Sequence, residues 1–405
     1  MPSIEPLNQA SSFEAATGGA SSVILFLTVF IDLLGFGIVV PFLPLFAKRM
    51  GVGAVGIGVV LAIYSLMQLI AAPILGRVSD RMGRRPVIML GLLGSSIGYV
   101  IYGFAGSLLS LLVSRAVHGA SAGTVSTAQA YIADTTSGMN RARGMGLIGA
   151  AFGLGFVLGP ALGGLLGHAS LRTPVFFAAA LTFADFIFAA LRLPESHPPE
   201  PGARLDLGRV VRPLAALPRE LGHHRLLRMF IVAFLMTFAF AALEATFAMM
   251  APQVYGYGAA GVGGLLAFAG LMQALAQGYL VGKVVPHVGE ARLLKIGLVM
   301  LTAGLAPIGS VSSHSALLLA LGILSLGYGF ASPSIASLIS RSVEEHRQGQ
   351  VLGVNQSALS LARILGPIAG GVTYEVAGPA APYLAGAVAV VLAISVTGAL
   401  GDAPT

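Results

Sequence analysis

Ionisable side chains stand inside the long apolar runs of this sequence, where a charge is costly and marks a candidate functional site. Asp32 lies in the first run and Arg115 in the fourth. Apolar surroundings favour the neutral form of a carboxyl group, whereas a nearby guanidinium favours the carboxylate. We therefore predict that Asp32, with Arg115 as its partner, takes part in proton coupling. The alternative is a static ion pair that fixes helix packing.

Glu244 in the seventh run is a second candidate for proton coupling, and Arg363 in the eleventh run is its candidate partner. Asp185 is a further acid within a run, and the sequence assigns it no role. Other residues within the runs complete a predicted substrate cavity: Gln68, His118, Gln129, Phe240, Gln273, Gln277, Asn355 and Gln356, together with Arg363. An interhelical hydrogen bond is the alternative role for each amide, and helix packing is the alternative for Phe240.

The link after the second run contains a predicted cytoplasmic gate, formed by Gly76, Asp80, Gly83, Arg84 and Arg85. The glycines permit a tight turn. Asp80 is expected to lie against the positive N-terminal end of a helix from the other half, while the arginines hold its carboxylate. In the second half, the corresponding link has Pro286, Glu290 and Ala291 in place of Asp80 and the arginine pair. We therefore expect an asymmetric gate.

The fifth run is rich in glycine, and small residues at every fourth position let two helices approach closely. Its predicted packing helix is marked by Gly155, Gly159, Pro160, Gly163 and Gly164. The stretch Gly-Pro-Ala-Leu-Gly-Gly that begins at Gly159 recurs 207 residues later as Gly-Pro-Ile-Ala-Gly-Gly, beginning at Gly366. The two halves of the chain therefore look like copies of each other, as in many secondary transporters.

The elements that must position these residues are membrane helices, because 56% of the 405 residues are hydrophobic and only 10% are charged. A helix that crosses a bilayer needs about 20 apolar residues. The sequence predicts an all-α membrane protein with twelve spans in two pseudo-symmetric six-helix bundles. The predicted spans are 22–47, 54–76, 87–106, 108–133, 144–168, 173–193, 227–251, 261–282, 293–312, 315–340, 349–374 and 380–401.

The predicted organisation is a cytoplasmic N-terminal tail (1–21), a first bundle (22–193), a cytoplasmic linker with six prolines (194–226) and a second bundle (227–401). Most of the 23 lysines and arginines lie in the links after even-numbered spans. Because basic loops stay in the cytoplasm, both termini are predicted to be cytoplasmic. The predicted location is the plasma membrane, as in the inner membrane of a bacterium.

The residue content excludes several other classes of function. The sequence has no cysteine, no zinc-binding His/Glu motif, no phosphate-binding loop and no nucleophile elbow. We therefore predict no enzyme activity, no metal and no cofactor, with a transmembrane proton gradient as the source of energy. The formal net charge of +7 follows from membrane topology and does not indicate nucleic-acid binding.

Across nearly its whole length the sequence resembles the drug:proton antiporter-1 branch of the major facilitator superfamily, and most of all the tetracycline-resistance exporters. The resemblance is carried by the segments 32–44, 76–86, 119–134, 152–160, 193–197 and 347–350. It implies the twelve-helix fold, and it identifies the glycine-rich fifth span as an antiporter motif. The exporters have titratable residues in spans 3, 8 and 9, where this chain has Gly98, Gln273 and Leu301. Exchange of metal–tetracycline is therefore not the expected reaction.

We predict a secondary active transporter that exports amphipathic drugs or related small molecules in exchange for protons, by alternating access. Its expected partners are a small-molecule substrate, protons and the lipid bilayer, and one chain is expected to function alone. A proton symporter or facilitator for a sugar, organic acid or other metabolite is the alternative within the same fold. A receptor or scaffold without transport activity is the alternative from another class.

Overall fold

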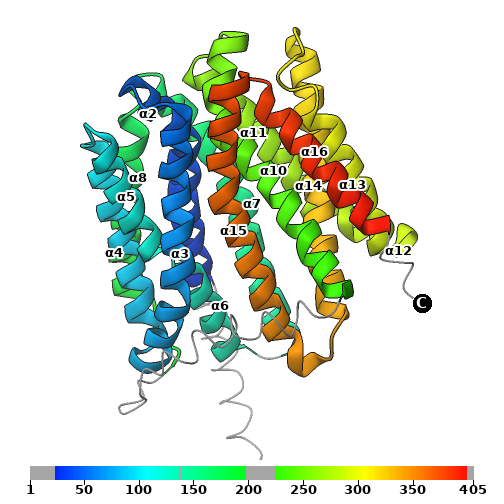
Figure 1. The fold of residues 1–405 in the computed structure, drawn as a ribbon. Coiled ribbons are helices and arrows are strands. Elements are labelled where there is room, and N and C mark those ends of the chain that lie inside the picture. The colour runs from blue at the N-terminus through cyan, green and yellow to red at the C-terminus, as the bar shows by residue number, and fades with distance from the viewer. Residues whose placement is uncertain (1–22, 137, 198–223, 399–405) are drawn as a thin grey trace, which may run out of the picture.

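The computed structural model describes residues 23–136, 138–197 and 224–398, without the side chains of 138–143, 345–347, 349–350 and 398. The predicted tail and most of the predicted linker lie outside the described residues. Helices form at each of the twelve predicted spans, arranged as two groups of six (Figure 1). The fold is therefore the all-α, two-bundle architecture expected from the sequence.

The first bundle begins with the span Val23–Arg49, which ends in the short helices η1 (Val40–Phe42) and α2 (Leu43–Arg49). It continues with α3 (Ala54–Met82), α4 (Arg84–Gly103), α5 (Leu108–Ser121) followed by α6 (Thr124–Thr135), α7 (Gly138–Gly167) and α8 (Thr173–Arg192). The second bundle begins with α10 (His224–Tyr255). Its second span consists of α11 (Ala259–Leu275), η2 (Ala276–Leu280) and α12 (Val281–Val288). The remaining helices are α13 (Glu290–Leu305), α14 (His314–Arg341), α15 (Glu345–Ala377) and α16 (Ala381–Gly398).

Nine of the described helices are long and apolar enough to cross a membrane by length and composition alone. The other three predicted spans correspond to α13, α15 and α16, of which α13 has only 16 residues. Large apolar side chains lie on the outside of the molecule, such as Phe104 at 73% and Val376 at 82% exposure. An outer surface of this kind suits a lipid environment. Lipid tails are themselves apolar, so moving an apolar side chain from lipid into the protein gains no hydrophobic free energy.

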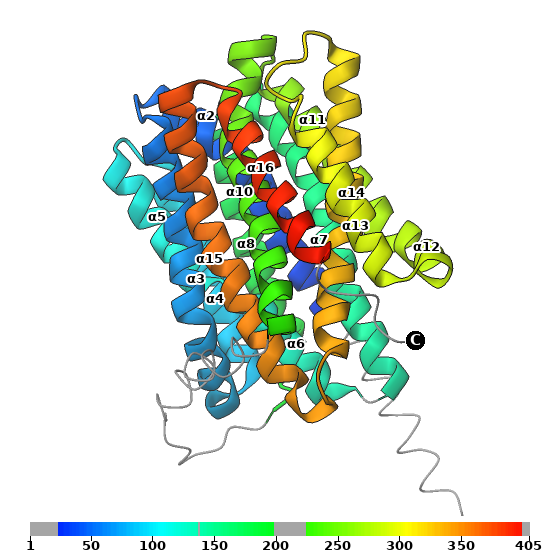
Figure 2. The same cartoon turned by 45° about the vertical axis from the view of Figure 1, so that its right-hand side comes forward.

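The molecule has two ends, which we name after residues that lie there. The Asp80 end is where α3 finishes and where α10 begins, and the α2 end is the opposite one (Figures 1 and 2). On the basis of the positive-inside rule, the Asp80 end is the predicted cytoplasmic end. The orientation in the membrane remains a prediction.

The two bundles meet along two helix pairs, α3 with α15 and α7 with α11. The first pair lies side by side in both ribbon views (Figures 1 and 2). The repeated glycine motif makes both contacts. A Cβ atom on Gly164 of α7 would be 3.0 Å from Gly263 of α11, and the equivalent Gly371 of α15 abuts Ala54 of α3. The last glycine of each motif therefore joins its own bundle to the opposite one.

The first glycine of each motif packs inside its own bundle. A Cβ atom on Gly159 would be 2.6 Å from the Cα atom of Gly37 in the first span, and one on Gly366 would be 2.6 Å from the carbonyl oxygen of Phe238 in α10. The first span and α10 are the first helices of their bundles. The sequence repeat is thus a repeat of packing, with the same two contacts made in each half.

The α2 end is closed and the Asp80 end is open. Glycines that touch the opposite bundle, such as Gly58, Gly164 and Gly263, lie toward the α2 end. On the same four helices, glycines nearer the Asp80 end face open space among the described residues: Gly76, Gly146, Gly149, Gly278, Gly282 and Gly353. If the Asp80 end is cytoplasmic, this arrangement is an inward-facing state.

The boundary between α3 and α4 differs from the sequence prediction. The link 76–86 was expected to form a tight turn with two glycines, but α3 remains helical to Met82 and α4 begins at Arg84. Only Gly83, at a φ of +98°, leaves the helical conformation, whereas Gly76 is an ordinary helical residue. The helix continues through the polar residues at the membrane surface because positions 77 to 82 contain no glycine or proline, the two residues that interrupt helices most strongly.

Candidate functional site

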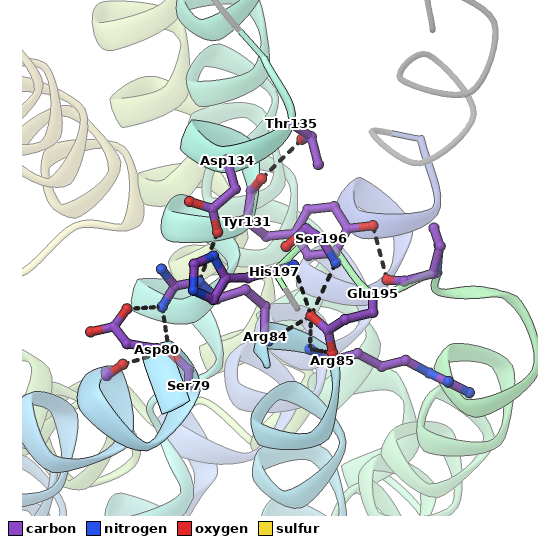
Figure 3. A network of polar contacts seen from close by, with 12 residues as sticks. Ser79, Asp80, Arg84, Arg85, Tyr131, Asp134, Thr135, Glu195, Ser196 and His197 are labelled. Atoms are coloured by element: carbon purple, nitrogen blue, oxygen red, sulfur yellow. Dashed lines mark hydrogen bonds and ion pairs between the residues drawn. The ribbon is translucent and has the colours of Figure 1, made fainter. Parts of the chain in front are cut away.

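A network of charged groups at the Asp80 end joins three segments that are distant in the sequence (Figure 3). Arg84, only 7% exposed, is its centre. Its Nε donates to Oδ2 of Asp134, at the end of α6, at 2.8 Å, and its Nη1 donates to the hydroxyl of Ser79 at 2.6 Å and to Asp80. The guanidinium group therefore ties α3, α4 and α6 together, and its charge is offset by two carboxylates.

Glu195, just after α8, completes this network from the other side of α4. Its Oε1 accepts from the backbone nitrogen of Arg84 at 2.7 Å, and Oε2 accepts from that of Arg85 at 3.2 Å. The carboxylate thus caps the N-terminus of α4, where the helix dipole favours negative charge. A side chain on Gly83 would collide with this carboxylate, so Gly83 is required for space as well as for its φ.

Sequence reasoning missed the parts played by Asp134 and Glu195. Both residues belong to segments that carry the family resemblance, 119–134 and 193–197. That was the available signal, but spacing alone does not show that these segments meet at Arg84. Only the packing of α4 against α6 and α8 brings them together.

Asp80 forms no hydrogen bond or ion pair with the second bundle among the described residues, which exclude the side chains of 345–347 and 349–350 in α15. The sequence placed its carboxylate against a helix N-terminus of the second bundle. Instead, the carboxylate pairs with Arg84 of its own bundle, and its side chain is 61% exposed. The physical reason is the open Asp80 end, which separates Asp80 from the second bundle. The arginine contact is as expected, and contact with the other half is left to a state in which this end closes.

The second bundle has a charge-reversed counterpart of the Arg84–Asp134 pair. Glu290 follows Arg84 by 206 residues and Arg341 follows Asp134 by 207. In the structure Nη1 of Arg341 lies 3.5 Å from Oε2 of Glu290, and the hydroxyl of Ser337 donates to Oε1 at 2.7 Å. The gate is asymmetric in charge, as expected. The replacement of arginine by glutamate nevertheless preserves the link between α13 and α14.

Arg115 in α5 lies in an aromatic cage in the first bundle. Its guanidinium carbon is 4.5 Å from the ring centre of Tyr64 and 6.0 Å from that of Phe36, a cation–π geometry. Its Nη1 is 3.2 Å from Nδ1 of His118. Because arginine can only donate, Nδ1 accepts and His118 carries its proton on Nε2. The side chain of Arg115 is 2% exposed.

The predicted ion pair between Asp32 and Arg115 is not formed. Asp32 instead lies beside Ser95 of α4, and its Oδ1 has no hydrogen-bond partner among the described residues. Tyr64 and Tyr99 interact electrostatically with both Asp32 and Arg115. The two charged groups therefore share a neighbourhood without touching, because Arg115 is directed toward Tyr64 and His118.

Glu244 and Arg363 are brought near each other between the bundles. They interact electrostatically, although no ion pair within 4 Å joins them among the described residues. Arg363 in α15 also interacts with Tyr328 of α14 and with Tyr64 of α3 in the other bundle. The side chain of Glu244 is exposed although it lies in the middle of α10. This position is consistent with a site between the halves.

The predicted cavity residues are placed differently from one another. Gln129, Gln277 and Gln356 are exposed, whereas Gln68, Gln273 and Phe240 are half-buried and Asn355 is 6% exposed. None of these amide side chains forms a hydrogen bond with another described residue, so the interhelical hydrogen bonds weighed as an alternative are absent in this part of the chain. Phe240 stacks on Tyr328, with ring centres 4.1 Å apart.

His118 does not line a cavity directly, which corrects one of the predicted cavity residues. It is 3% exposed, and the rings of Tyr99, Tyr64 and Phe36 surround it at 4.5, 5.1 and 6.1 Å. A packed aromatic shell of this kind excludes a ligand from the ring. His118 instead holds Arg115 in place from behind.

Gly98 explains one departure from the tetracycline exporters. A Cβ atom at this position would be 3.0 Å from Cβ of His118, and the hydroxyl of Ser114 donates to the Gly98 carbonyl at 2.9 Å. The close approach of α4 and α5 leaves no room for a carboxylate. The packing around Arg115 and the titratable residue of span 3 are therefore mutually exclusive in this chain.

The glycine-rich α7 packs against the first span from Leu33 onward, the residue after Asp32. A Cβ atom on Gly155 would be 3.1 Å from Leu33, and one on Gly163 would be 2.5 Å from the carbonyl oxygen of Ile38. Gly155, Gly159 and Gly163 thus form the face expected from their spacing, and this face meets the first span. Gly164, near Pro160, belongs to the neighbouring face that meets α11.

Comparisons with known proteins agree with this architecture. The chain is 33% identical to the tetracycline resistance protein, class C, of Escherichia coli over 350 residues, covering 85% of this chain and 87% of that protein. It is 30% identical to multidrug resistance protein 2 of Bacillus subtilis (strain 168) over 366 residues, covering 87% and 88%. The crystal structure of the human organic anion transporter MFSD10 (TETRAN) superposes with a TM-score of 0.71 at 28% identity, covering 94% and 99%.

The family profile described as Major Facilitator Superfamily matches residues 25–367 and again 287–404. These matches cover both bundles and all the residues of the site. The protein is accordingly a multi-pass membrane transporter and not an enzyme. The chain belongs to the Major Facilitator Superfamily.

Proposed function

We propose that this protein exports amphipathic small molecules in exchange for protons that enter the cytoplasm. The observation that carries the proposal is the position of Asp32. This acid lies within the first bundle beside Ser95 of α4, and it forms no ion pair with the caged Arg115, although Tyr64 and Tyr99 interact with both. A carboxyl group in such surroundings can bind and release a proton as the packing around it changes.

The proposed mechanism is alternating access around a layer of charged residues between the bundles, which contains Glu244 and Arg363. With the Asp80 end open, a substrate reaches this layer from the cytoplasm and Asp32 releases its proton there. The halves then rock, the Asp80 end closes and the α2 end opens. Substrate leaves, and a proton from the outside returns to Asp32. Glu244, which is exposed and near Arg363, is the candidate for a second proton or for contact with substrate.

The direction of transport is supported by the relatives. The alignments with the relatives named for tetracycline resistance and multidrug resistance extend over most of the length of those proteins. Uptake of a sugar or other metabolite has no comparable support. We further propose that a single chain suffices, since both bundles belong to it, and that it resides in the inner membrane of a bacterium with the Asp80 end inside.

Reconstitution into proteoliposomes tests this function. A panel of amphipathic drugs that includes tetracycline is first screened for growth protection in a host lacking its own exporters. With a drug that passes this screen, an imposed pH gradient should drive accumulation by the wild type. Asp32→Asn should abolish it, because an amide cannot carry the proton.

Asp32→Glu is the matched control, since it keeps the carboxyl group and should retain part of the coupling. Exchange of labelled for unlabelled drug without a pH gradient checks that both variants still bind substrate. Unchanged gradient-driven transport by Asp32→Asn would show that Asp32 is not the coupling residue. Accumulation of the drug in the same direction as the proton movement, instead of the opposite direction, would identify a symporter.

A further inference from the structure

Asp185 in α8 is a second buried acid of the first bundle, and it has no role in the mechanism described above. It is 1% exposed, and neither carboxylate oxygen has a hydrogen-bond partner among the described residues. Buried carboxylates without a hydrogen-bond or ion-pair partner are rare in proteins. Taking a charge out of water costs several kcal/mol unless a partner offsets that cost. An acid in this position therefore calls for a functional explanation.

Asp185 and Asp32 interact electrostatically, and Thr28 of the first span stands beside Asp185. Thr28 precedes Asp32 by one helical turn, so both face the same side of the first span. Thr28 is 0% exposed, and its hydroxyl is also without a partner among the described residues. The side of the first span that carries Thr28 and Asp32 thus faces Asp185 of α8.

Further polar groups connect this pair to Arg115. Thr182, one turn before Asp185 in α8, is completely buried with an unpartnered hydroxyl. A Cβ atom on Gly35 of the first span would be 3.1 Å from the hydroxyl oxygen of Thr182 and 3.7 Å from that of Tyr99. The ring of Tyr99 is 4.5 Å from that of His118, which contacts Arg115. Because position 35 is glycine, the row of polar groups is not interrupted there.

We propose that Asp185 and Asp32 form one proton-binding pair that takes up a single shared proton in each transport cycle. Two neighbouring carboxylates in a low dielectric repel each other when both are charged, so binding of one proton relieves the repulsion for both. The proton moves between the two carboxyl oxygens as α8 and the first span shift relative to each other. No other species is consumed, since the proton enters from one side and leaves on the other. This inference rests on the proposed proton coupling and adds its second acid.

The groups that face the pair from the neighbouring helices are few among the described residues. The first span contributes Thr28 and α4 contributes Ser95 and Tyr99, of which only the tyrosine is titratable. Arg115 and His118 of α5 lie beyond Tyr99. No lysine or arginine forms an ion pair with either acid among these residues.

Asp185→Asn tests the pair in the same proteoliposomes. We expect exchange of labelled for unlabelled drug without a gradient to stay within about twofold of the wild type, and accumulation driven by a pH gradient to fall about tenfold or more. The pH at which driven transport is half-maximal should move to lower pH, because Asp32 loses a negatively charged neighbour. Asp185→Glu should restore most of the accumulation. The matched control Thr173→Val, which alters a threonine of α8 at the far end of the helix without removing an acid, should keep the wild-type pH profile.

Infrared difference spectra of the purified protein between high and low pH give a readout that does not depend on transport. A protonated-carboxyl band should shift in position and titrate at a different pH in Asp185→Asn and again in Asp32→Asn, and it should be unchanged in Thr173→Val. An unaltered pH profile and an unaltered band in Asp185→Asn would overturn the inference, as would equal losses of exchange and driven accumulation. Wild-type accumulation that requires Na⁺ at constant pH would overturn it in favour of a cation site. If the wild type shows no proton-driven transport, the proposed function fails, while the spectra still decide whether the two acids share a proton.

Discussion

Arg84 has two carboxylate partners that differ in their exposure to water. The side chain of Asp134 is 24% exposed and lies 2.8 Å from Nε, whereas that of Asp80 is 61% exposed. Exposed ion pairs contribute about 0–1 kcal/mol, because water screens both charges. A hydrogen bond to a charge at a less exposed position contributes about 1.5–3 kcal/mol. The stability of this corner therefore rests on Asp134, which leaves Asp80 available for another contact.

Asp134→Asn should accordingly lower the free energy of unfolding more than Asp80→Asn, by about 1 kcal/mol or more. The opposite order is expected for transport, since Asp80 is the proposed gating residue and its loss should slow the closing of the Asp80 end. Thermal unfolding in detergent and transport in proteoliposomes measure the two effects separately. A larger loss of stability in Asp80→Asn would contradict this division of roles.

At the scale of the elements, glycine faces determine how closely the helices approach. Gly159 of α7 and Gly366 of α15 occupy equivalent positions and both abut backbone atoms at less than 3 Å from an added Cβ. Backbone cannot move aside as a flexible side chain can. Gly149 lies on the same α7 and faces open space. A substitution at Gly149 therefore measures the low helix propensity of glycine alone, whereas one at Gly159 also measures the packing of α7 against the first span.

Gly159→Ala should destabilise the protein by about 1–3 kcal/mol through overpacking, and Gly366→Ala should do the same. Gly149→Ala serves as the control and should be neutral or stabilising by about 0.5–1 kcal/mol, because alanine is the better helix former. Thermal unfolding in detergent compares the three variants. Equal effects at positions 149 and 159 would mean that the contact with the first span is not tight.

At the scale of the whole molecule, α3 and α15 run in opposite directions and form one contact between the bundles. At the α2 end, Oε1 of Glu375, near the end of α15, accepts from the backbone nitrogen of Val55 at the start of α3 at 3.0 Å. The opposite end of the pair is the Asp80 end. Asp80 lies near the end of α3 there, and α15 begins at this same end. Glu375 thus caps the start of α3 in this state, and Asp80 is the acid near the opposite end of the same helix.

Joining the closed end should therefore stop the transport cycle. The chain has no cysteine, so Val55→Cys combined with Glu375→Cys provides the only thiols. A short, cleavable thiol cross-linker should abolish transport by this double variant, because the α2 end can no longer open, and cleavage of the linker should restore it. Each single variant treated with the same reagent is the control. Full transport in the cross-linked protein would show that this end does not open during the cycle.

The sequence predicted the helices well because their signal is local. Apolar runs of sufficient length, interrupted by basic links, gave all twelve spans to within a few residues at most ends, although α3 continues through the supposed loop to Met82. The glycine spacing also predicted the face of α7 correctly. Partners of charged residues were predicted less well. Arg115 faces Tyr64 and His118 instead of Asp32, and Asp134 and Glu195 were missed as partners of Arg84.

The sequence by itself determined that the chain is a duplicated membrane protein, because the bilayer requires long apolar helices whose backbone groups are satisfied within each segment. It also identified which acids lie within those helices. Only the tertiary structure decided which of them are neighbours and which end of the molecule is closed. Those properties depend on contacts of a few ångströms between helices far apart in the chain, as where Gly35 of the first span lies against Thr182 of α8. No periodicity within either helix specifies such a contact.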